Sequence, residues 1–327
     1  MRAPAKKPGR TRFRLLVHLL IAVIVAPAAM VLAGTAPASA HPYDRFREDW
    51  VAAPGGVGQI KVRIWLANNG SNKAVYLLDG LRATNDVSGW EHETNAAWLS
   101  DQGVNVVMPV GGESSFYTDW YAPSNFNAQP YTYKWESFLT QNLPNHLAAA
   151  YGIDRHSNGV VGISMGGNAA LVLAGYHRDQ FKFAGSLSGY LNLSAPGMPE
   201  AIRVAMLDAG RYNADSMWGP PWDPAWRRND PFVVAPQLAG LPMWISAGSG
   251  LPGAHDHPVA PIDYYNTANG MGLEALALAQ NRAFEIRLAT LGIPAHFDFP
   301  AQGTHSWGYW QDQLWGLLPM LKGAIGA

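Results

Sequence analysis

Gly162, Ser164 and Gly166 form the single Gly-x-Ser-x-Gly pattern of the chain, which is a pattern that can present a nucleophilic serine. An apolar, β-branched run leads into it at 160–163, and a helical pattern of small residues follows at 168–175. Strand, sharp turn and helix in this order are the context of a nucleophile elbow, which exposes the serine hydroxyl above a sheet. Glycines suit both flanks because the neighbouring backbones run very close there. We therefore predict that Ser164 is a nucleophile; an ordinary serine in a tight glycine turn is the alternative.

A nucleophilic serine needs a base, and His305 is the best-placed histidine for that role. It follows the last predicted strand (297–299) through a loop rich in Pro and Gly, and folds with this elbow place Ser, acid and His in that chain order. A histidine on a surface loop is the alternative. His255 and His257 follow the preceding strand too closely, and two histidines in a flexible loop are a weak metal signal. We therefore expect no metal and no other cofactor.

The acid that orients the base is not decided by spacing. Asp256 lies in the loop after the predicted strand 242–246, where the generic chain order would place the acid. Asp263 and Glu274 lie further downstream. On chemistry alone, Asp256 is the favoured acid.

The elements that would position these residues alternate between strands and helices. Strands are predicted at 59–66 (an early edge strand with one buried face), 74–78, 104–109, 160–163, 181–186, 242–246 and 296–299, and helices at 95–101, 135–151 (with a kink or break at Pro144) and 168–176. Such alternation implies a mostly parallel sheet with helices on both faces. The segment 190–236 departs from this pattern and is crowded with Trp and Pro. We interpret it as an insertion within one domain, either a lid or substrate wall or a packed surface excursion.

The first 40 residues have the pattern of an export signal. A basic stretch with six Lys or Arg precedes an apolar run from Leu15 to about Leu32, and small residues at Ala38 and Ala40 favour cleavage before His41. An uncleaved membrane anchor is the alternative. Cleavage would leave 17 basic and 24 acidic residues, which makes nucleic-acid binding a poor candidate function. The chain has no cysteine, so disulfides are excluded even in an oxidising compartment.

Short stretches spread in order along the chain resemble one known family. They lie at 76–82, 107–112, 115–117, 119–121, 133–136, 162–165, 184–188, 217–219, 223–226, 228–231 and 303–307. Through them, nearly the whole mature chain resembles the antigen 85 family of secreted mycolyltransferases, enzymes of the trehalose mycolyltransferase and diacylglycerol acyltransferase type with an esterase-like α/β-hydrolase fold. The resemblance implies that fold for residues 41–327, with the insertion at about 190–236.

The resemblance also selects the acid. In the family the acid is a glutamate of a Leu-Glu pair about thirty residues before the histidine, and the match here is Glu274, with Asn281 and Phe284 at the family's later spacing. A solvated carboxylate on a helix surface is the alternative. The implied triad is therefore Ser164, Glu274 and His305, and the implied oxyanion hole consists of the backbone N–H groups of Leu81 and Met165.

The implied reaction transfers a mycolyl group from trehalose monomycolate, through an acyl-enzyme on Ser164, to a second trehalose monomycolate or to arabinogalactan during cell-envelope assembly. The resemblance implies substrate contacts from Leu81, Arg82, Asn192, Ser306 and Trp307. Asn192 replaces an aspartate of the family, and the alternative for Arg82 is an ion pair with Asp79.

The chain also departs from the better-known members of the family. Asn125 and Pro130 stand at the positions of their cysteine pair, and Ala247 replaces a further cysteine, whereas the three triad residues are all present. Two rival functions stay open: a secreted carboxylesterase or lipase of the same fold, and a non-enzymatic envelope adhesin, since the family also resembles surface antigens that bind extracellular-matrix proteins. The sequence does not indicate an oligomeric state or an acyl chain length.

Overall fold

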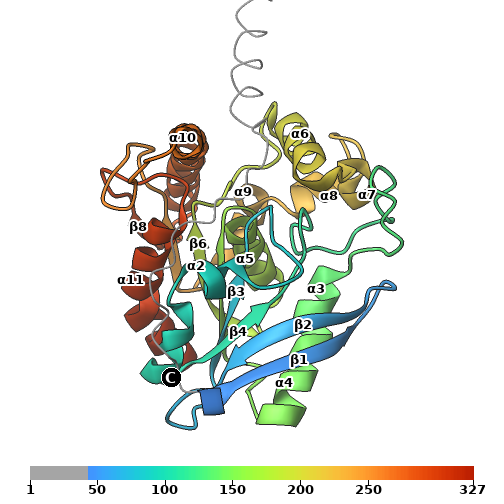
Figure 1. Cartoon of the computed structure of the whole chain (residues 1–327), viewed down its shortest axis with the longest axis vertical. Coiled ribbons are helices and arrows are strands. Elements are labelled where there is room, and N and C mark those ends of the chain that lie inside the picture. Colours follow the sequence, from blue (N-terminus) through green and yellow to red (C-terminus); the bar gives the residue numbers. More distant parts are fainter. Residues whose placement is uncertain (1–42) are drawn as a thin grey trace, which may run out of the picture.

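The computed structural model describes residues 43–327, which form an eight-stranded sheet with helices on both faces (Figure 1). The strands are β1 (Phe46–Ala53), β2 (Gly58–Trp65), β3 (Ala74–Leu78), β4 (Asn105–Pro109), β5 (Asn158–Ile163), β6 (Phe181–Leu187), β7 (Met243–Ser246) and β8 (His296–Asp298). They lie in the order β1-β2-β4-β3-β5-β6-β7-β8, and all neighbours from β4 to β8 pair in parallel. The predicted export signal and its cleavage site between Ala40 and His41 lie outside the described residues.

The prediction of an edge strand at 59–66 is wrong. This segment is β2, which pairs antiparallel with β1 on one side and with β4 on the other, so β1 is the edge strand. Sequence analysis missed β1 because its sequence, FREDWVAA, carries three charges and buries only Val51 fully. An edge strand with so few buried side chains lacks the apolar alternation by which strands are recognised.

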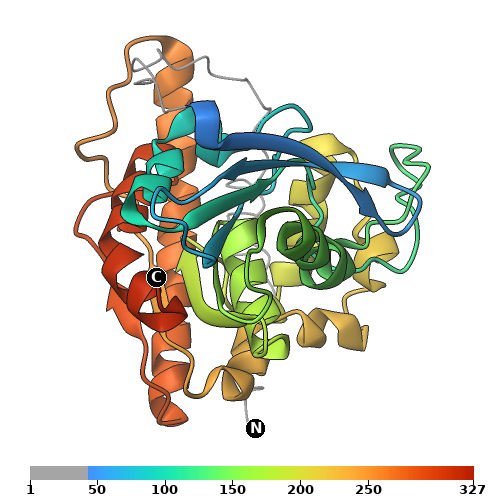
Figure 2. The same ribbon diagram turned by 90° about the horizontal axis from the view of Figure 1, so that it is seen from below.

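Helices cover the two faces of the sheet with separate hydrophobic clusters. One face packs against α3 (Trp135–Ser137), α4 (Leu143–Tyr151), α5 (Met165–Tyr176) and the C-terminal part of α10 (Pro261–Thr290). The other face packs against α2 (Gly89–Glu93), the 3₁₀ helix η2 (Ala96–Gln102) and α11 (Trp307–Ile325). Seen from below, α10 runs along one side of the molecule next to α11 (Figure 2). In residues 43–327 no helix is both long and apolar enough to cross a membrane.

The helical segment 135–151 is interrupted, as expected, before Pro144. Five residues between α3 and α4 form a π-helical stretch, Phe138–Asn142, and Pro144 then occupies the first turn of α4. Proline has no backbone N–H and is tolerated in a first helical turn, where that donor is not needed. The wider π turn therefore places the proline at the start of a new helix.

The insertion predicted at 190–236 is built of short helices above the carboxyl ends of the strands (Figure 1). They are α6 (Met198–Gly210), α7 (Ala214–Trp218), α8 (Pro224–Arg228), α9 (Pro231–Val234) and the 3₁₀ helix η4 (Ala235–Leu238). The tryptophans Trp218 and Trp226 are buried and packed edge to face, whereas Trp222 is exposed. The aromatic residues of the insertion therefore serve mainly as its core.

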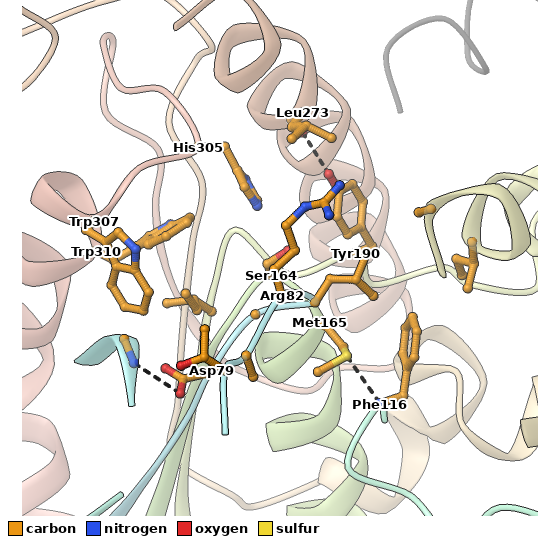
Figure 3. A pocket seen from close by; sticks show the side chains of 18 of the residues that line it. Asp79, Arg82, Phe116, Ser164, Met165, Tyr190, Leu273, His305, Trp307 and Trp310 are labelled. Atoms are coloured by element: carbon orange, nitrogen blue, oxygen red, sulfur yellow. Dashed lines mark hydrogen bonds between the residues drawn. The ribbon is translucent and has the colours of Figure 1, made fainter. Parts of the chain in front are cut away.

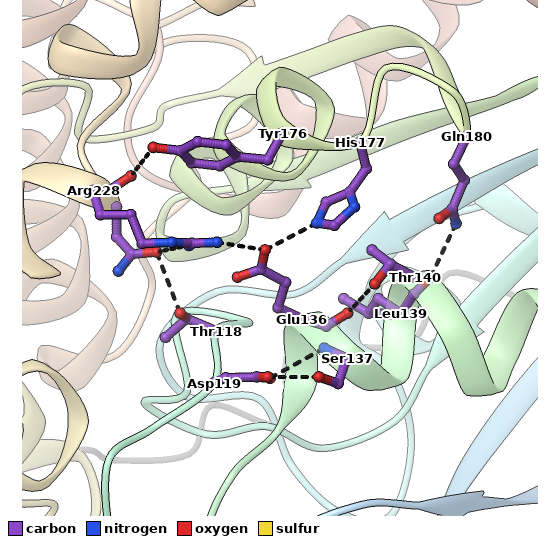
Figure 4. A network of polar contacts seen from close by, with 11 residues as sticks. Thr118, Asp119, Glu136, Ser137, Leu139, Thr140, Tyr176, His177, Gln180 and Arg228 are labelled. Carbon is purple, nitrogen blue, oxygen red and sulfur yellow. Dashed lines mark hydrogen bonds and ion pairs between the residues drawn. The ribbon is translucent and has the colours of Figure 1, made fainter.

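A network of polar contacts fastens the insertion to the body of the protein (Figure 4). Glu136 of α3 accepts a hydrogen bond from Arg228 of α8 at 2.7 Å, and its carboxylate lies 2.9 Å from the His177 ring. The Arg228 guanidinium also lies over the Tyr176 ring, 4.5 Å from its centroid. Burial opposes the charge on Glu136, but the contacts with His177 and Arg228 outweigh it and lower the pKa of this carboxyl.

Candidate active site

Ser164 lies at the sharp turn between β5 and α5, with φ +50° and ψ −119°. Residues with side chains rarely adopt this backbone conformation. The turn requires glycine on both sides. A Cβ on Gly162 would lie 2.2 Å from the carbonyl oxygen of Gly166, and a Cβ on Gly166 would lie 2.5 Å from that of Asp79. The predicted elbow is therefore present in the structure.

His305 and Glu274 meet beside this turn. The Nδ1 atom of His305 lies 2.7 Å from the Oε2 atom of Glu274, and the imidazole points toward Ser164 (Figure 3). The other carboxylate oxygen of Glu274 accepts hydrogen bonds from the Ser188 hydroxyl at 2.7 Å and the Gly248 N–H at 2.6 Å. Because Nδ1–H donates to the carboxylate, Nε2 of His305 is the nitrogen that can accept a proton.

The structure pairs His305 with Glu274 and not with Asp256. Asp256 instead accepts hydrogen bonds from Thr304 and Tyr309, whereas Glu274 is only 1% exposed and comes from the middle of α10. The prediction from chemistry alone therefore chose the wrong carboxylate. The generic chain order favours an acid on the loop directly after a strand. It does not indicate an acid that lies in the middle of a long helix further along the chain.

The two backbone N–H groups of the expected oxyanion hole belong to segments that lie next to Ser164. Met165 is the first residue of α5, so its N–H belongs to the open N-terminal turn of the helix, where the helix dipole favours negative charge. Leu81 lies in the loop after β3, which runs along the elbow: a Cβ on Gly80 would lie 3.6 Å from the Ser164 Cβ. Within residues 43–327 neither amide donates a hydrogen bond to another group. Both are therefore available to an oxyanion.

Ser164 and His305 line a cavity of about 430 Å³ whose wall is mostly apolar and carries a few polar side chains. The polar side chains of this wall are Asp79, Arg82, Thr84, His92 and Glu93, and its large apolar side chains include Phe116, Met165, Leu193, Met198, Ile202, Leu273, Leu276 and Trp307. These polar side chains come from α2 and from the loop after β3, whereas α6 of the insertion and α10 contribute apolar side chains to the wall. Such a wall can contact both apolar and polar groups of a substrate.

Not all predicted contact residues reach this cavity. Leu81, Arg82 and Trp307 line it, but Asn192 and Ser306 are not part of its wall. The Asn192 N–H donates to the Gln280 side chain at 3.0 Å, and the Ser306 hydroxyl oxygen lies 3.3 Å from that of Thr304. Arg82 forms an ion pair with Asp208 of α6, so its alternative pairing with Asp79 is wrong.

Asp79 is a residue of the cavity wall that sequence analysis considered only as a partner for Arg82. Its buried carboxyl accepts hydrogen bonds from the Ser88 hydroxyl at 3.2 Å and from the N–H groups of Gly89 and Trp90 at 3.2 and 3.3 Å. Burial raises the pKa of Asp79 to about 7. Asp79 thus holds the start of α2, whose Trp90 packs edge to face on Trp307 in the cavity. No local pattern in the sequence indicates this role of Asp79.

Phe116 and Tyr190 were also not singled out as cavity residues. Phe116 has φ +50°, and its N–H lies 3.2 Å from the Met165 sulfur. Tyr190 donates a hydrogen bond to the Leu273 carbonyl at 3.3 Å and faces the His305 ring. Near Phe116, the only indication in the sequence was the Ser-Phe-Tyr stretch on which the resemblance rests. No feature of the sequence indicated that Tyr190 lines the cavity.

Comparison with known proteins gives the same family along almost the whole chain. A family model described as "Putative esterase" matches residues 58–321. The diacylglycerol acyltransferase/mycolyltransferase Ag85B of Mycobacterium avium is 43% identical over 320 residues, covering 96% of this chain and 94% of that protein. Ag85B of Mycolicibacterium smegmatis is 41% identical over 326 residues, covering 97% and 98%.

Solved structures agree with this assignment. The crystal structure of Mycobacterium tuberculosis MPT51 (FbpC1) superposes with a TM-score of 0.74 at 34% identity, covering 88% of this chain and 100% of that one. FphF, a fluorophosphonate-binding serine hydrolase of Staphylococcus aureus, superposes with a TM-score of 0.61 at 14% identity over 84% of this chain and 97% of that one, which shows a shared fold. The chain belongs to the antigen 85 family, with the α/β-hydrolase fold of the esterases.

Proposed function

We propose that the protein is a serine acyltransferase that moves a mycolyl group from trehalose monomycolate to a second trehalose monomycolate or to arabinogalactan. The observation that carries the proposal is that Ser164 and His305, whose ring is held by Glu274, line one cavity with both apolar and polar side chains in its wall. The relatives named diacylglycerol acyltransferase/mycolyltransferase support the same chemistry.

In the first half-reaction, the Ser164 hydroxyl attacks the ester carbonyl of trehalose monomycolate while Nε2 of His305 accepts the hydroxyl proton. Glu274 holds the ring through Nδ1–H and stabilises the imidazolium. The N–H groups of Leu81 and Met165 bind the tetrahedral oxyanion, where loss of one donor typically costs about 3–4 kcal/mol of barrier. The carbon–oxygen bond to the sugar then breaks, His305 returns the proton to the sugar oxygen, and trehalose leaves.

In the second half-reaction, a hydroxyl of the acceptor takes the place of the leaving sugar. His305 removes its proton as it attacks the acyl-Ser164 ester, and the serine oxygen recovers the proton when the ester breaks. Donor and acceptor use the same serine in turn, so the kinetics should be ping-pong.

The walls of the cavity match such a substrate. Arg82 and Trp307 line the cavity and would contact the sugar, by hydrogen bonds and by a flat aromatic face. The apolar side chains of α6 and α10 that line the cavity would contact the first carbons of the acyl chain. Asn192 and Ser306 lie outside this wall, so the proposal assigns them no contact.

We further infer that the enzyme works in the cell envelope as one catalytic domain that begins near His41 and carries the insertion as a wall of its substrate site. The export signal predicted before His41 and the membership of the family support this location. Binding of arabinogalactan or of extracellular-matrix proteins belongs to the proposal and awaits direct binding measurements.

A trehalose-exchange assay tests the proposal. The protein is incubated with a synthetic trehalose 6-monoester and isotope-labelled trehalose, and the glycolipid and free fatty acid are quantified. A transferase moves the label into the glycolipid. Release of free fatty acid without label in the glycolipid would indicate an esterase. If neither product forms, the protein is a binding protein and not an enzyme of this kind.

A further inference from the structure

The loop between β7 and α10 packs against the loop that carries His305. The Gly250 N–H donates to the Gly303 carbonyl at 2.8 Å, and the Gly303 N–H donates to the Leu251 carbonyl at 2.7 Å. A Cβ on Gly248 would lie 2.6 Å from the Gly303 carbonyl oxygen, so the two backbones are in direct contact. The position of His305 therefore depends on this neighbouring loop.

Through the side chain of Asp256, the neighbouring loop binds residues on both sides of His305 in the sequence. One carboxylate oxygen accepts a hydrogen bond from the Thr304 hydroxyl at 2.6 Å. The other accepts from the Tyr309 hydroxyl and from the Gly253 N–H, the latter at 2.9 Å. Thr304 directly precedes His305, and Tyr309 follows it on the first turn of α11.

We propose that Asp256 is a positioning residue that holds His305 in register with Ser164 by binding Thr304 and Tyr309 together. The inference rests on the proposed role of His305 as the base. Asp256 does not bind the His305 ring, which Glu274 orients through Nδ1. Glu274 thus sets the rotation of the ring, whereas Asp256 sets the path of the backbone that carries it.

The surroundings of Asp256 favour this role. The ring of His255 packs edge to face on Tyr309, and its Nε2 lies 2.7 Å from the Asp312 carboxylate on α11. Burial and the hydrogen bond to Asp256 raise the pKa of Tyr309 to about 12, so its hydroxyl stays a donor through the neutral range. On the far side, the His305 N–H donates to the Gly270 carbonyl of α10 at 3.1 Å. His305 therefore lies between α10 and the loop that follows β7, and Asp256 provides the side-chain contacts from that loop.

The test compares Asp256→Ala with Asp263→Ala. Asp263 is a matched control because its carboxylate also accepts hydrogen bonds from two N–H groups, those of Val259 and Ala260, but forms no hydrogen bond or ion pair with residues 303–309. The main readout is the rate at which a fluorophosphonate probe labels Ser164, because the serine oxygen displaces fluoride only when His305 accepts its proton. Hydrolysis of a short p-nitrophenyl ester gives kcat and KM, and thermal melting gives the stability of each variant.

We expect Asp256→Ala to lower the labelling rate and kcat about tenfold or more with KM within about twofold, since small misplacements of a catalytic group are costly. Asp263→Ala should keep both rates within about twofold of the wild type. In a Thr304→Val/Tyr309→Phe background, which lacks both hydroxyls, Asp256→Ala should cause little further loss. If Asp256→Ala does not fold, Thr304→Val/Tyr309→Phe alone must show the same fall.

A wild-type labelling rate in Asp256→Ala, or an equal fall of that rate in Asp263→Ala, would overturn the inference while leaving the proposed function intact. A full additional loss in the Thr304→Val/Tyr309→Phe background would also overturn it. Failure of the wild-type protein to be labelled at Ser164 would instead contradict the proposed function itself.

Discussion

The Glu274 carboxylate binds His305 through one oxygen and is anchored to the body of the protein through the other. Its Oε2 atom lies 2.7 Å from Nδ1 of His305, while its Oε1 atom accepts hydrogen bonds from Ser188 and Gly248. Ser188 is itself fixed by the Trp310 indole N–H at 2.8 Å. The acid therefore cannot turn without breaking two donor contacts, and the orientation of the base follows from this anchorage.

Glu274→Gln should lower kcat/KM for ester substrates by about 10³-fold or more. The donors Ser188 and Gly248 would hold the amide oxygen of the glutamine, so its NH₂ group would face Nδ1 of His305 and favour the wrong tautomer. Glu285→Gln, on the outer side of α10, serves as the control and should change kcat/KM less than twofold. A loss below about tenfold in Glu274→Gln would contradict the assigned role of this carboxylate.

The free energy of unfolding should depend on pH through Asp79. Its pKa is about 7 in the folded protein against an ordinary value of 3.8, so the folded state keeps a proton that the unfolded state has lost. This carboxyl therefore favours the folded state fully below about pH 4, and its contribution is lost as the pH rises toward 7. Summed over this range, the loss is on the order of 3 kcal/mol.

Denaturant titrations at pH 4.5 to 8 test this dependence. Because the side chain of Asp79→Asn cannot ionise, the free energy of unfolding of the variant should rise relative to that of the wild type as the pH increases. Asp86→Asn, an exposed carboxylate of the same loop, is the control and should follow the wild type. A constant difference between Asp79→Asn and wild type over this range would show that the buried carboxyl does not titrate there.

Glu136→Gln should loosen the insertion. The substitution removes the charge that binds Arg228 and His177, and hydrogen bonds to charged groups typically contribute about 1.5–3 kcal/mol. Because the pKa of Glu136 is lowered in the folded protein, its contribution is present above the ordinary carboxyl pKa and is lost as the pH falls through the lowered value. The stability gap between wild type and variant should therefore narrow in acid, as denaturant titrations at pH 7 and pH 3 would measure. A gap that widens in acid would refute this account.

Much of the fold could be predicted because its centre follows simple rules. β3, β4 and β5 are buried along their whole length and appear as continuous apolar runs, and the elbow at Ser164 has a motif with a mechanical cause. β1 was missed because a charged edge strand has no such pattern. Pro144 indicated the interruption of its helix but not the π-helical form that precedes it.

The candidate site was only partly predictable from local pattern. Ser164 and His305 lie at positions that chain order indicates, whereas Glu274 comes from a long helix whose path across the sheet edge no spacing rule describes. Asp79 binds Ser88, nine residues away, and Asp256 binds Tyr309, 53 residues away, through hydrogen bonds that depend on the completed fold. Tertiary contacts of this kind are not encoded in any short stretch of residues.

The central claim is that Ser164 carries the acyl group during transfer, and intact mass spectrometry tests it most directly. Wild-type protein and Ser164→Ala are incubated with a synthetic trehalose 6-monoester, with and without excess free trehalose. We predict an acyl adduct on the wild type alone, which trehalose discharges faster than buffer does. No adduct on the wild type, or an equal adduct on Ser164→Ala, would contradict the account.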